Sequence, residues 1–366
     1  MSGIHNILRR SVLPLMLATL FLVPRPAQAA SNLQRELGVV AQEIAKFVKD
    51  MNEESVSVGE FRAPPQLAAS AGPAIAQVLS DEIRKHGVQV KSRAKLGVEG
   101  RYRDVIDEKT KRLAAQIQIS LVDRAGKEIL SLDRGVFGDA TLSSLFGATT
   151  DLPPTADDKT RDQKIQDALD KPSTNLRGTR ISPSPESPYG IEILIKSGPG
   201  MQPRQPKDDD GLAFVPIHRH EIYAIKLHND SPYEAAVTLT IDGLNVFCFS
   251  QNKTYTQWII PPKTHGTIIG WHVTNEGSDS FQVTEYSKSA AAVKMPNSAK
   301  LGTITASFAA AWPKEAMPPS DEPPSPHEFA RSADATGRGP HVATKYTEVQ
   351  RLFGVTRAAV SVRYTK

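Results

Sequence analysis

The stretch that decides the fold reads Thr238-Leu239-Thr240-Ile241-Asp242-Gly243-Leu244-Asn245-Val246. Apolar and polar residues alternate on both sides of its central Asp-Gly pair, which is typical of two half-buried strands. Asp-Gly is a preferred pair for a two-residue hairpin, because both central residues of a type I′ turn need a positive φ. The stretch therefore predicts an antiparallel hairpin within a β-rich unit.

Short strand-like runs continue on both sides of this hairpin. Turn residues separate them at regular spacing, as in antiparallel sandwiches. The predicted strands cover residues 191–196, 213–216, 221–228, 235–241, 244–249, 257–260, 266–271, 280–284 and 302–312. A Pro-rich insertion lies near 313–341, and Val360-Ser361-Val362-Arg363-Tyr364 then alternates again. We therefore expect residues 189–366 to form a β-sandwich domain, with its last strand returning to pair with it.

The first half of the chain mixes helical and strand-like patterns. Apolar residues recur at helical spacing from Leu33 to Met51, and a second helix is expected from about Pro73 to Gly87. Strands are expected at 56–61, 88–90, 98–104, 113–123 and 128–137. This order predicts a small α/β domain at residues 30–147, with helices packed on one sheet. The expected fold class is α+β, a small α/β domain followed by an antiparallel β-sandwich.

Residues 148–188 separate the two predicted domains. Prolines cluster at both ends, at 153–154 and 183–188, around a short charged piece with helical character at 157–171. Proline-rich chain favours extended, semi-rigid conformations, so this segment is predicted to be a linker.

The first thirty residues have the organisation of a secretory signal peptide. Arg9 and Arg10 precede an apolar run at 12–23, and Ala27-Gln28-Ala29 fits a small-residue cleavage site. The apolar run is shorter than the roughly 20 residues that span a bilayer. We expect residues 1–29 to be removed and the mature chain to start at Ala30. That chain would be exported to the periplasm or cell surface, without a transmembrane segment.

Charge and cysteine content narrow the choice of partners. The formal net charge is only +4, and no run of five Lys or Arg residues occurs. Nucleic-acid binding calls for a concentrated basic patch, so no nucleic-acid partner is expected.

Cys248 is the sole cysteine, which excludes an intramolecular disulfide. It lies in an apolar run, so a buried structural thiol is expected.

Aromatic residues of the second unit form the candidate ligand site. Trp271 is followed directly by His272, and Trp258 and Tyr255 lie shortly before them. If these rings were exposed on one face, they would provide a platform for a sugar. The alternative is core packing, because aromatic side chains dominate sandwich cores.

Histidines of the same unit raise the question of a metal site. His218 and His220 would point to one face of a strand, and His228, His265 and His272 follow in the sequence. Three imidazoles could hold zinc, but no carboxylate stands at a characteristic ligand spacing. Surface histidines are the alternative, so whether His218 and His220 bind metal stays open and no metal ligand is assigned. Nucleotide, hydrolase and metalloprotease motifs are absent, so we expect no catalytic residue and no cofactor. A third alternative, a glycoside hydrolase, would need two carboxylates that the fold brings to about 5–9 Å, and the sequence leaves it open.

Two resemblances follow from the order of these patterns. The run Val56-Ser57-Val58-Gly59-Glu60-Phe61, the helix ending near Gly87, Val98-Glu99-Gly100-Arg101-Tyr102, and Ile117 to Asp123 together resemble an envelope domain. That domain is shared by FlgO-type flagellar-assembly proteins, activators of penicillin-binding proteins and the curli-secretion lipoprotein. Leu227 to Ser231, Ile241 to Val246, Ile260-Pro261-Pro262, Ile269-Gly270-Trp271 and Leu301 to Ile304 resemble an uncharacterised bacterial envelope β-sandwich family.

The first resemblance implies an adaptor or assembly role rather than catalysis. The leading hypothesis is therefore an exported, non-enzymatic adaptor of the bacterial cell envelope that binds other envelope proteins. Surface complementarity and addition of a strand to a sheet edge would supply the affinity. The alternative is a carbohydrate- or cell-wall-binding protein that uses the β-sandwich as its ligand module, with a glycan or wall polymer as partner.

Overall fold

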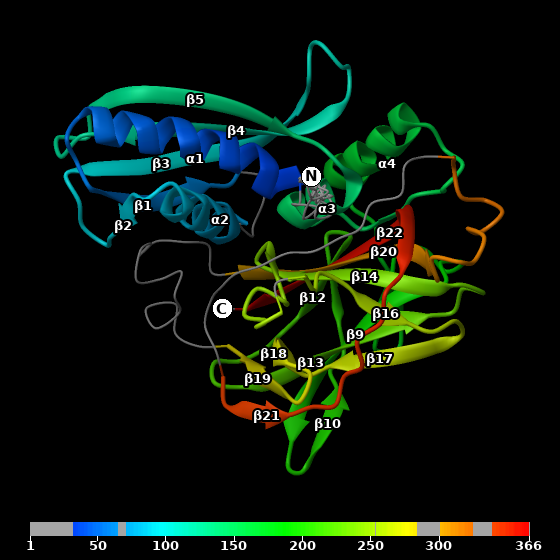
Figure 1. Cartoon of the computed structure of the whole chain (residues 1–366). Helices are drawn as coiled ribbons and strands as arrows, with labels where there is room; N and C mark the ends of the chain where they lie inside the picture. Colours follow the sequence, from blue (N-terminus) through cyan, green and yellow to red (C-terminus); the bar gives the residue numbers. More distant parts are fainter. Residues whose placement is uncertain (1–31, 65–70, 253, 284–300, 325–338, 366) are drawn as a thin grey trace, which may run out of the picture.

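The computed structural model describes residues 32–64, 71–252, 254–283, 301–324 and 339–365. The signal peptide predicted at 1–29 lies outside these ranges. The fold is mixed α+β with several antiparallel sheets, so the predicted fold class is confirmed at that level (Figure 1). Within the described ranges, no helix combines the length and apolar character needed to cross a membrane.

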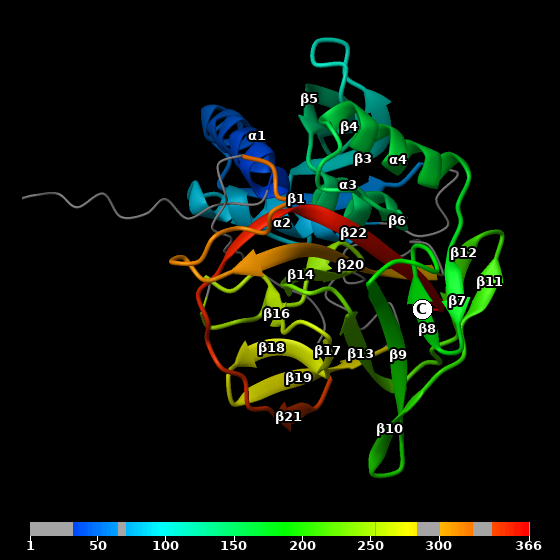
Figure 2. The same ribbon diagram turned by 90° about the vertical axis from the view of Figure 1, so that its right-hand side faces the viewer.

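The N-terminal lobe is built on a five-stranded sheet. Its elements are α1 (Asn32–Asp50), β1 (Ser55–Arg62), α2 (Gly72–Lys85), β2 (Gln89–Val90), β3 (Leu96–Ile106), β4 (Leu113–Val122), β5 (Glu128–Val136), α3 (Asp139–Phe146) and α4 (Asp158–Asp170). The strand order is β2-β1-β3-β4-β5, with β1 parallel to β2 and β3, and the remaining pairs antiparallel. Helices α1 and α2 pack together on one face of the sheet (Figures 1 and 2).

Alternation along the strands decides which face of this sheet the helices cover. Ile117, Ile119 and Leu121 of β4 are buried, whereas Gln118 and Ser120 between them are only half-buried. Successive strand residues point to opposite faces, so the apolar set faces the helices. Leu37, Val40 and Ile44 of α1 join the same core cluster.

Residues 148–188 are folded, so the prediction of an extended linker is wrong, whereas the helical piece expected at 157–171 is confirmed as α4. They contain β6 (Thr150–Asp151), α4, β7 (Asn175–Arg177) and β8 (Arg180–Ser182). Leu152 and Ile165 are buried in the N-terminal core, and Ile181 is buried in the C-terminal core. The prolines stand between these short elements, where they interrupt no ladder of hydrogen bonds.

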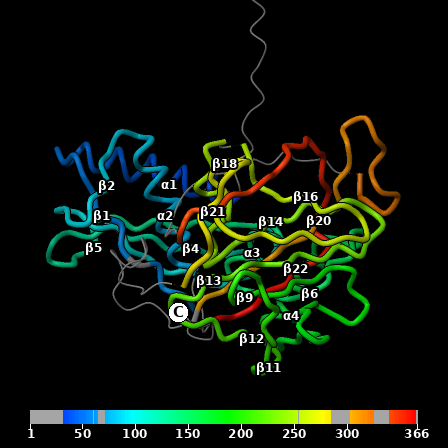
Figure 3. The backbone as a smooth tube through the Cα atoms, turned by 90° about the horizontal axis from the view of Figure 1, so that it is seen from below, coloured from blue at the N-terminus to red at the C-terminus, as the bar shows by residue number. Residues whose placement is uncertain are grey.

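The C-terminal lobe contains two sheets around a second core. One sheet holds β7, β8, β9 (Tyr189–Ser197), β10 (Gly200–Pro203), β13 (Ile222–Asn229), β17 (Thr264–Ile268), β18 (Gly270–Thr274), β19 (Gly277–Gln282) and β21 (His341–Ala343). The other holds β6, β11 (Lys207–Asp209), β12 (Leu212–Val215), β14 (Glu234–Ile241), β15 (Leu244–Asn245), β16 (Trp258–Ile260), β20 (Leu301–Trp312) and β22 (Leu352–Thr365). Tyr189 of the first sheet stacks on Phe308 of the second, with ring centroids 5.0 Å apart. Figure 3 shows the two lobes from a third direction.

The predicted hairpin is confirmed. Strands β14 and β15 pair in an antiparallel register that joins Ile241 to Leu244. Asp242 and Gly243 have φ values of 53° and 80°, as the type I′ turn requires. Strand β15 ends at Asn245, so the strand expected to reach Phe249 is shorter than predicted. Beyond it the chain turns into the core, where Cys248 is buried as expected.

The returning C-terminal strand is also confirmed. It lies inside its sheet rather than at an edge. Strand β22 lies between β12 and β20 and also pairs with β6. The Pro-rich insertion is anchored to it, because Arg357 forms ion pairs with Asp321 and Glu322, both at 2.8 Å. Residues 325–338 of the insertion lie outside the described ranges.

Candidate functional site

The structure brings three of the four predicted ligand residues together. The ring centroids of Tyr255 and His272 are 5.3 Å apart, and those of Trp258 and His272 are 5.9 Å apart. Phe247 and Tyr346 complete this aromatic cluster, with centroids 5.1 and 5.8 Å from that of His272.

Trp271 lies elsewhere, because neighbouring strand residues point to opposite faces. Its ring packs edge-on against Phe249 and Phe281, with centroids 5.5 and 5.4 Å away. The adjacent Trp-His pair therefore does not form one binding surface.

Burial assigns these residues to packing rather than to a sugar platform. The exposed fractions are 9% for Trp258, 6% for Trp271 and 1% for His272, and Tyr255 is half-buried. The two ring nitrogens of His272 lie 3.1 Å from Ser250 Oγ and 3.2 Å from Asn275 Oδ1. Burial lowers the pKa of His272, which favours the neutral ring.

The histidines proposed as a metal cluster are dispersed. His218 and His220 lie in the turn between β12 and β13, not on a strand, and both side chains are exposed. His228 and His265 face each other across β13 and β17, with ring centroids 5.8 Å apart. In the described part of the chain, no three His, Cys, Asp or Glu side chains are grouped to hold a metal ion.

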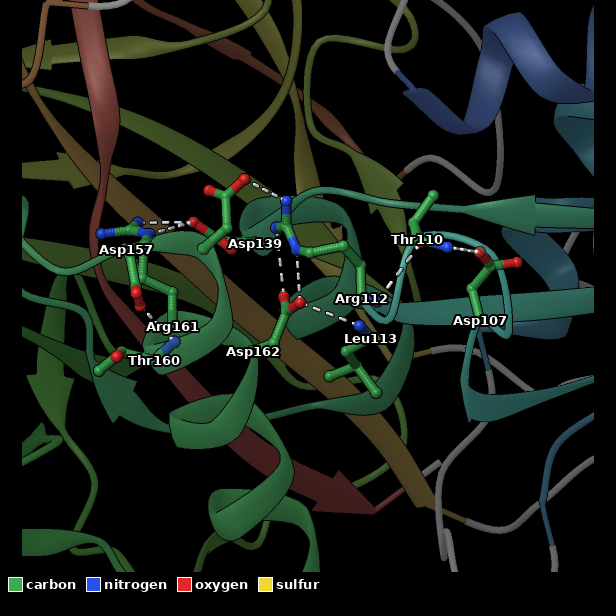
Figure 4. A network of polar contacts seen from close by, with 10 residues as sticks. Asp107, Thr110, Arg112, Leu113, Asp139, Asp157, Thr160, Arg161 and Asp162 are labelled. Carbon is green, nitrogen blue, oxygen red and sulfur yellow. Dashed lines mark hydrogen bonds and ion pairs between the residues drawn. The ribbon is translucent and has the colours of Figure 1, made fainter.

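A network of ion pairs joins α4 to the N-terminal sheet and to α3 (Figure 4). Asp162 accepts hydrogen bonds from Arg112 Nε at 2.5 Å and from the Leu113 backbone N–H at 2.9 Å. Arg161 donates through Nε to Asp139 at 2.9 Å and through Nη2 to the Thr356 carbonyl of β22. Each buried charge in this network has an opposite partner, so the network is structural.

An open polar face lies on the side of the five-stranded sheet away from α1 and α2. Arg101 and Arg103 of β3 are exposed on it and donate hydrogen bonds to the side-chain oxygens of Gln118 and Gln116 on β4. Asp133 of β5 is exposed and pairs in register with Gln118. This face is available to a partner. In the sequence, the charged residues at alternate positions of residues 99–103 indicate that this side of the strand is exposed.

The edge strand β5 is the longest terminal strand in the described sheets. The other strands at the ends of the strand orders are β2, β7, β11, β15 and β18, which have two, three, three, two and five residues, whereas β5 has nine. The strands beside these orders, β6, β10, β16, β17 and β21, have five residues at most. An edge strand presents unpaired backbone N–H and C=O groups, and proteins usually keep such strands short. Sequence reasoning missed this site because an alternating strand reads the same at an edge as in the centre.

Buried polar side chains form part of the contact between the two lobes. Thr240 of β14, Thr305 of β20 and Ser361 of β22 are buried on the face of their sheet that is turned away from the C-terminal core. Helix α3 packs against β20 and β22, and its Ser144 Oγ lies 2.9 Å from Thr240 Oγ1. Ser361 Oγ donates to the Ala148 carbonyl at 2.9 Å. These Ser and Thr residues alternate with core residues along their strands and line the contact between the lobes.

Comparison with known proteins gives no match to this chain. No family model, no curated protein and no solved structure matches it. The resemblances to envelope families therefore stay predictions from the sequence pattern.

Proposed function

We propose that the protein is an exported, non-enzymatic adaptor or assembly protein of the bacterial cell envelope, acting by protein–protein binding. In this proposal residues 1–29 direct export to the periplasm or cell surface. Residues 30–147 provide an α/β envelope domain, and residues 189–366 provide a β-sandwich. The folded segment 148–188 joins them, and the partners are other envelope proteins.

The observation that carries the proposal is the open edge of β5. An extended segment of a partner would add to this edge as a sixth strand, and its backbone would pair with that of β5. Nine edge residues allow a ladder as long as the one between β4 and β5, which has eight residue pairs. Affinity would come from the backbone, and specificity from the side chains on the two faces.

The surroundings of this edge fit an incoming strand. Leu130 and Leu132 of β5 point toward the helices and are half-buried, so an added strand would cover them further. On α1, Glu43 pairs with Arg134 of β5 at 2.5 Å. Val39 lies one turn before Glu43 on the same side of that helix and is 44% exposed. An apolar partner residue would pack under α1 against it.

Proline substitutions test strand addition directly. Successive N–H groups of an edge strand point alternately to the neighbouring strand and to solvent. Of Ser131→Pro and Leu132→Pro, one variant removes a free edge N–H and the other removes a bond to β4. We expect the variant that removes a free edge N–H to fold normally. The immobilised wild-type protein should capture a partner from a bacterial envelope extract, and this variant should not.

Ser131→Ala and Leu132→Ala are the matched controls, because they keep the backbone N–H. Both should retain the partner if the backbone carries the interaction. The proposal is wrong if both proline variants fold and capture the partner as the wild type does.

The carbohydrate-binding alternative depended on exposed aromatic rings. Trp258 and Trp271 are buried in core packing, so that alternative has no platform at these residues.

A further inference from the structure

A buried arginine lies where the two lobes meet. Arg363 is on β22, paired in register with Thr303 of β20 and Phe214 of β12. Its neighbours Val362 and Tyr364 belong to the C-terminal core, so the Arg363 side chain points out of the opposite face, toward α3. Its Nη2 atom lies 3.3 Å from the position that a Cβ on Gly147 would take, at the end of α3.

No carboxylate in the described part of the chain forms an ion pair with this guanidinium, although Asp209 favours its charge from a longer distance. Arg363 is 7% exposed, and its hydrogen bond runs from Nη1 to Thr303 Oγ1 at 3.5 Å. Its Nε is buried without a partner among the described residues. No described carboxylate lies within ion-pair distance of it.

The other two buried arginines show how this protein normally treats such a charge. Arg161 is paired with Asp139 at 2.5 Å, and Arg357 is paired with both Asp321 and Glu322 at 2.8 Å. Burial opposes the charge, but hydrogen bonds to its two carboxylates raise the pKa of Arg357 overall. Burial lowers the pKa of Arg363, and the opposing influence of Tyr102 and Asp209 does not offset it. Arg363 is thus the exception among three buried guanidinium groups.

The rest of the surroundings does not replace the missing anion. The C-terminal end of α3 carries only a fraction of a negative charge. The Ala148 carbonyl that follows α3 accepts from Ser361 Oγ. Ser143 lies one turn before Gly147 on α3, and its hydroxyl is also buried without a partner among the described residues. One polar group on α3 and one on β22 therefore lack a partner among the described residues.

We propose that Arg363 anchors a binding site for a small oxyanion, a carboxylate or a phosphate, between α3 and the β20–β22 pair. A guanidinium presents its N–H groups as a fork that matches both kinds of anion. The Thr303 hydroxyl is placed to donate a further hydrogen bond. Because α3 belongs to one lobe and β22 to the other, the bound anion strengthens the contact between the lobes.

Thermal unfolding of the purified full-length protein tests this site. Sodium phosphate and sodium acetate are titrated separately, with the ionic strength held constant by sodium chloride. One of the two should raise Tm by several degrees along a saturating curve, since a ligand that binds only the folded state stabilises it. The effective anion identifies the class of ligand. Saturation by neither anion overturns the proposal.

Two methionine variants provide the matched comparison. Arg363→Met should abolish the saturating response and should not lower Tm in chloride alone, because it removes an uncompensated buried charge. Arg357→Met should lower Tm and keep the response. The proposal fails if Arg363→Met keeps the response, or lowers Tm in chloride as much as Arg357→Met does.

A milder variant covers the case in which Arg363→Met does not fold. Thr303→Val keeps the arginine and removes one hydroxyl donor. It should weaken the effective anion about tenfold, as expected for loss of one hydrogen bond to a charged group. Unchanged anion affinity in Thr303→Val, measured by equilibrium dialysis with radiolabelled phosphate or acetate, would place the anion elsewhere.

Discussion

Replacing Gly243 by alanine should destabilise the protein far more than the same change in an equivalent turn. Gly243 has a φ of 80°, and a Cβ placed there would lie 2.9 Å from the Cβ atoms of both Ala71, the N-cap of α2, and Ala74 in its first turn. The left-handed backbone alone costs an alanine about 1–2 kcal/mol. Overpacking against α2 adds about 1–3 kcal/mol. We therefore expect Gly243→Ala to lower the free energy of unfolding by roughly 2–5 kcal/mol.

Gly178→Ala is the matched control for this change. Gly178 lies in the two-residue turn between β7 and β8 with a φ of 60°, and nothing lies within 4 Å of its Cβ position. Gly178→Ala should therefore lose only the free energy that the left-handed backbone costs an alanine. Urea unfolding followed by circular dichroism and tryptophan fluorescence gives both values, and equal losses for the two variants would refute the contact between the hairpin and α2.

A double-mutant cycle separates packing from backbone strain. Ala71 precedes α2 at its N-cap, where glycine is tolerated. Ala71→Gly should therefore cost little alone and should recover part of the loss in Gly243→Ala. An additive pair would mean that the two residues do not touch in solution.

Four further predictions concern other parts of the chain. Limited proteolysis should spare residues 150–182, because their strands are paired and their helix is packed. Early cleavage in this segment would instead support an extended linker. Arg357→Met should lower the free energy of unfolding by about 3–5 kcal/mol, since it leaves the buried Glu322 without its cation; a loss below about 1 kcal/mol in urea unfolding contradicts this. The lowered pKa of His272 means that the unfolded chain binds a proton at this ring more readily than the folded chain does, so stability should fall as pH drops below about 6.5. The urea midpoint of His272→Gln should fall less steeply with pH than that of the wild type. An identical fall would exclude His272 as a cause. N-terminal sequencing of the protein recovered from the envelope should begin at Ala30, and an intact Met1 there would contradict removal of the signal peptide.

Local chemistry made part of the fold predictable. The turn at Asp242 and Gly243 is set by backbone preferences of those two residues, and the alternation of β4 is set by one buried face. These signals are contained within about ten residues, so sequence reasoning reaches them. The returning strand β22 was predictable for the same reason.

Long-range pairing decided what sequence reasoning missed. Strand β6 has two residues and exists because it pairs with Ala358 and Ala359 of β22. The aromatic cluster around His272 includes Tyr346, which is distant in sequence. Whether a tryptophan is exposed, or a Ser/Thr stripe solvated, depends on which element covers it. That information lies in the partner elements and not in the stretch itself.

The pairing of β22 also sets the order in which the chain can fold. Ser361 hydrogen-bonds to Thr149 and Ala148, which precede it by 212 and 213 residues. A ribosome makes the chain from its N-terminus, so β20 can pair with β14, and β12 with β11, before β22 exists, whereas the pairs that β6, β12 and β20 form with β22 wait until β22 has been synthesised. Contacts of such long sequence separation form slowly. The delay leaves the sheet that holds β20 incomplete until the last residues of the chain have been made.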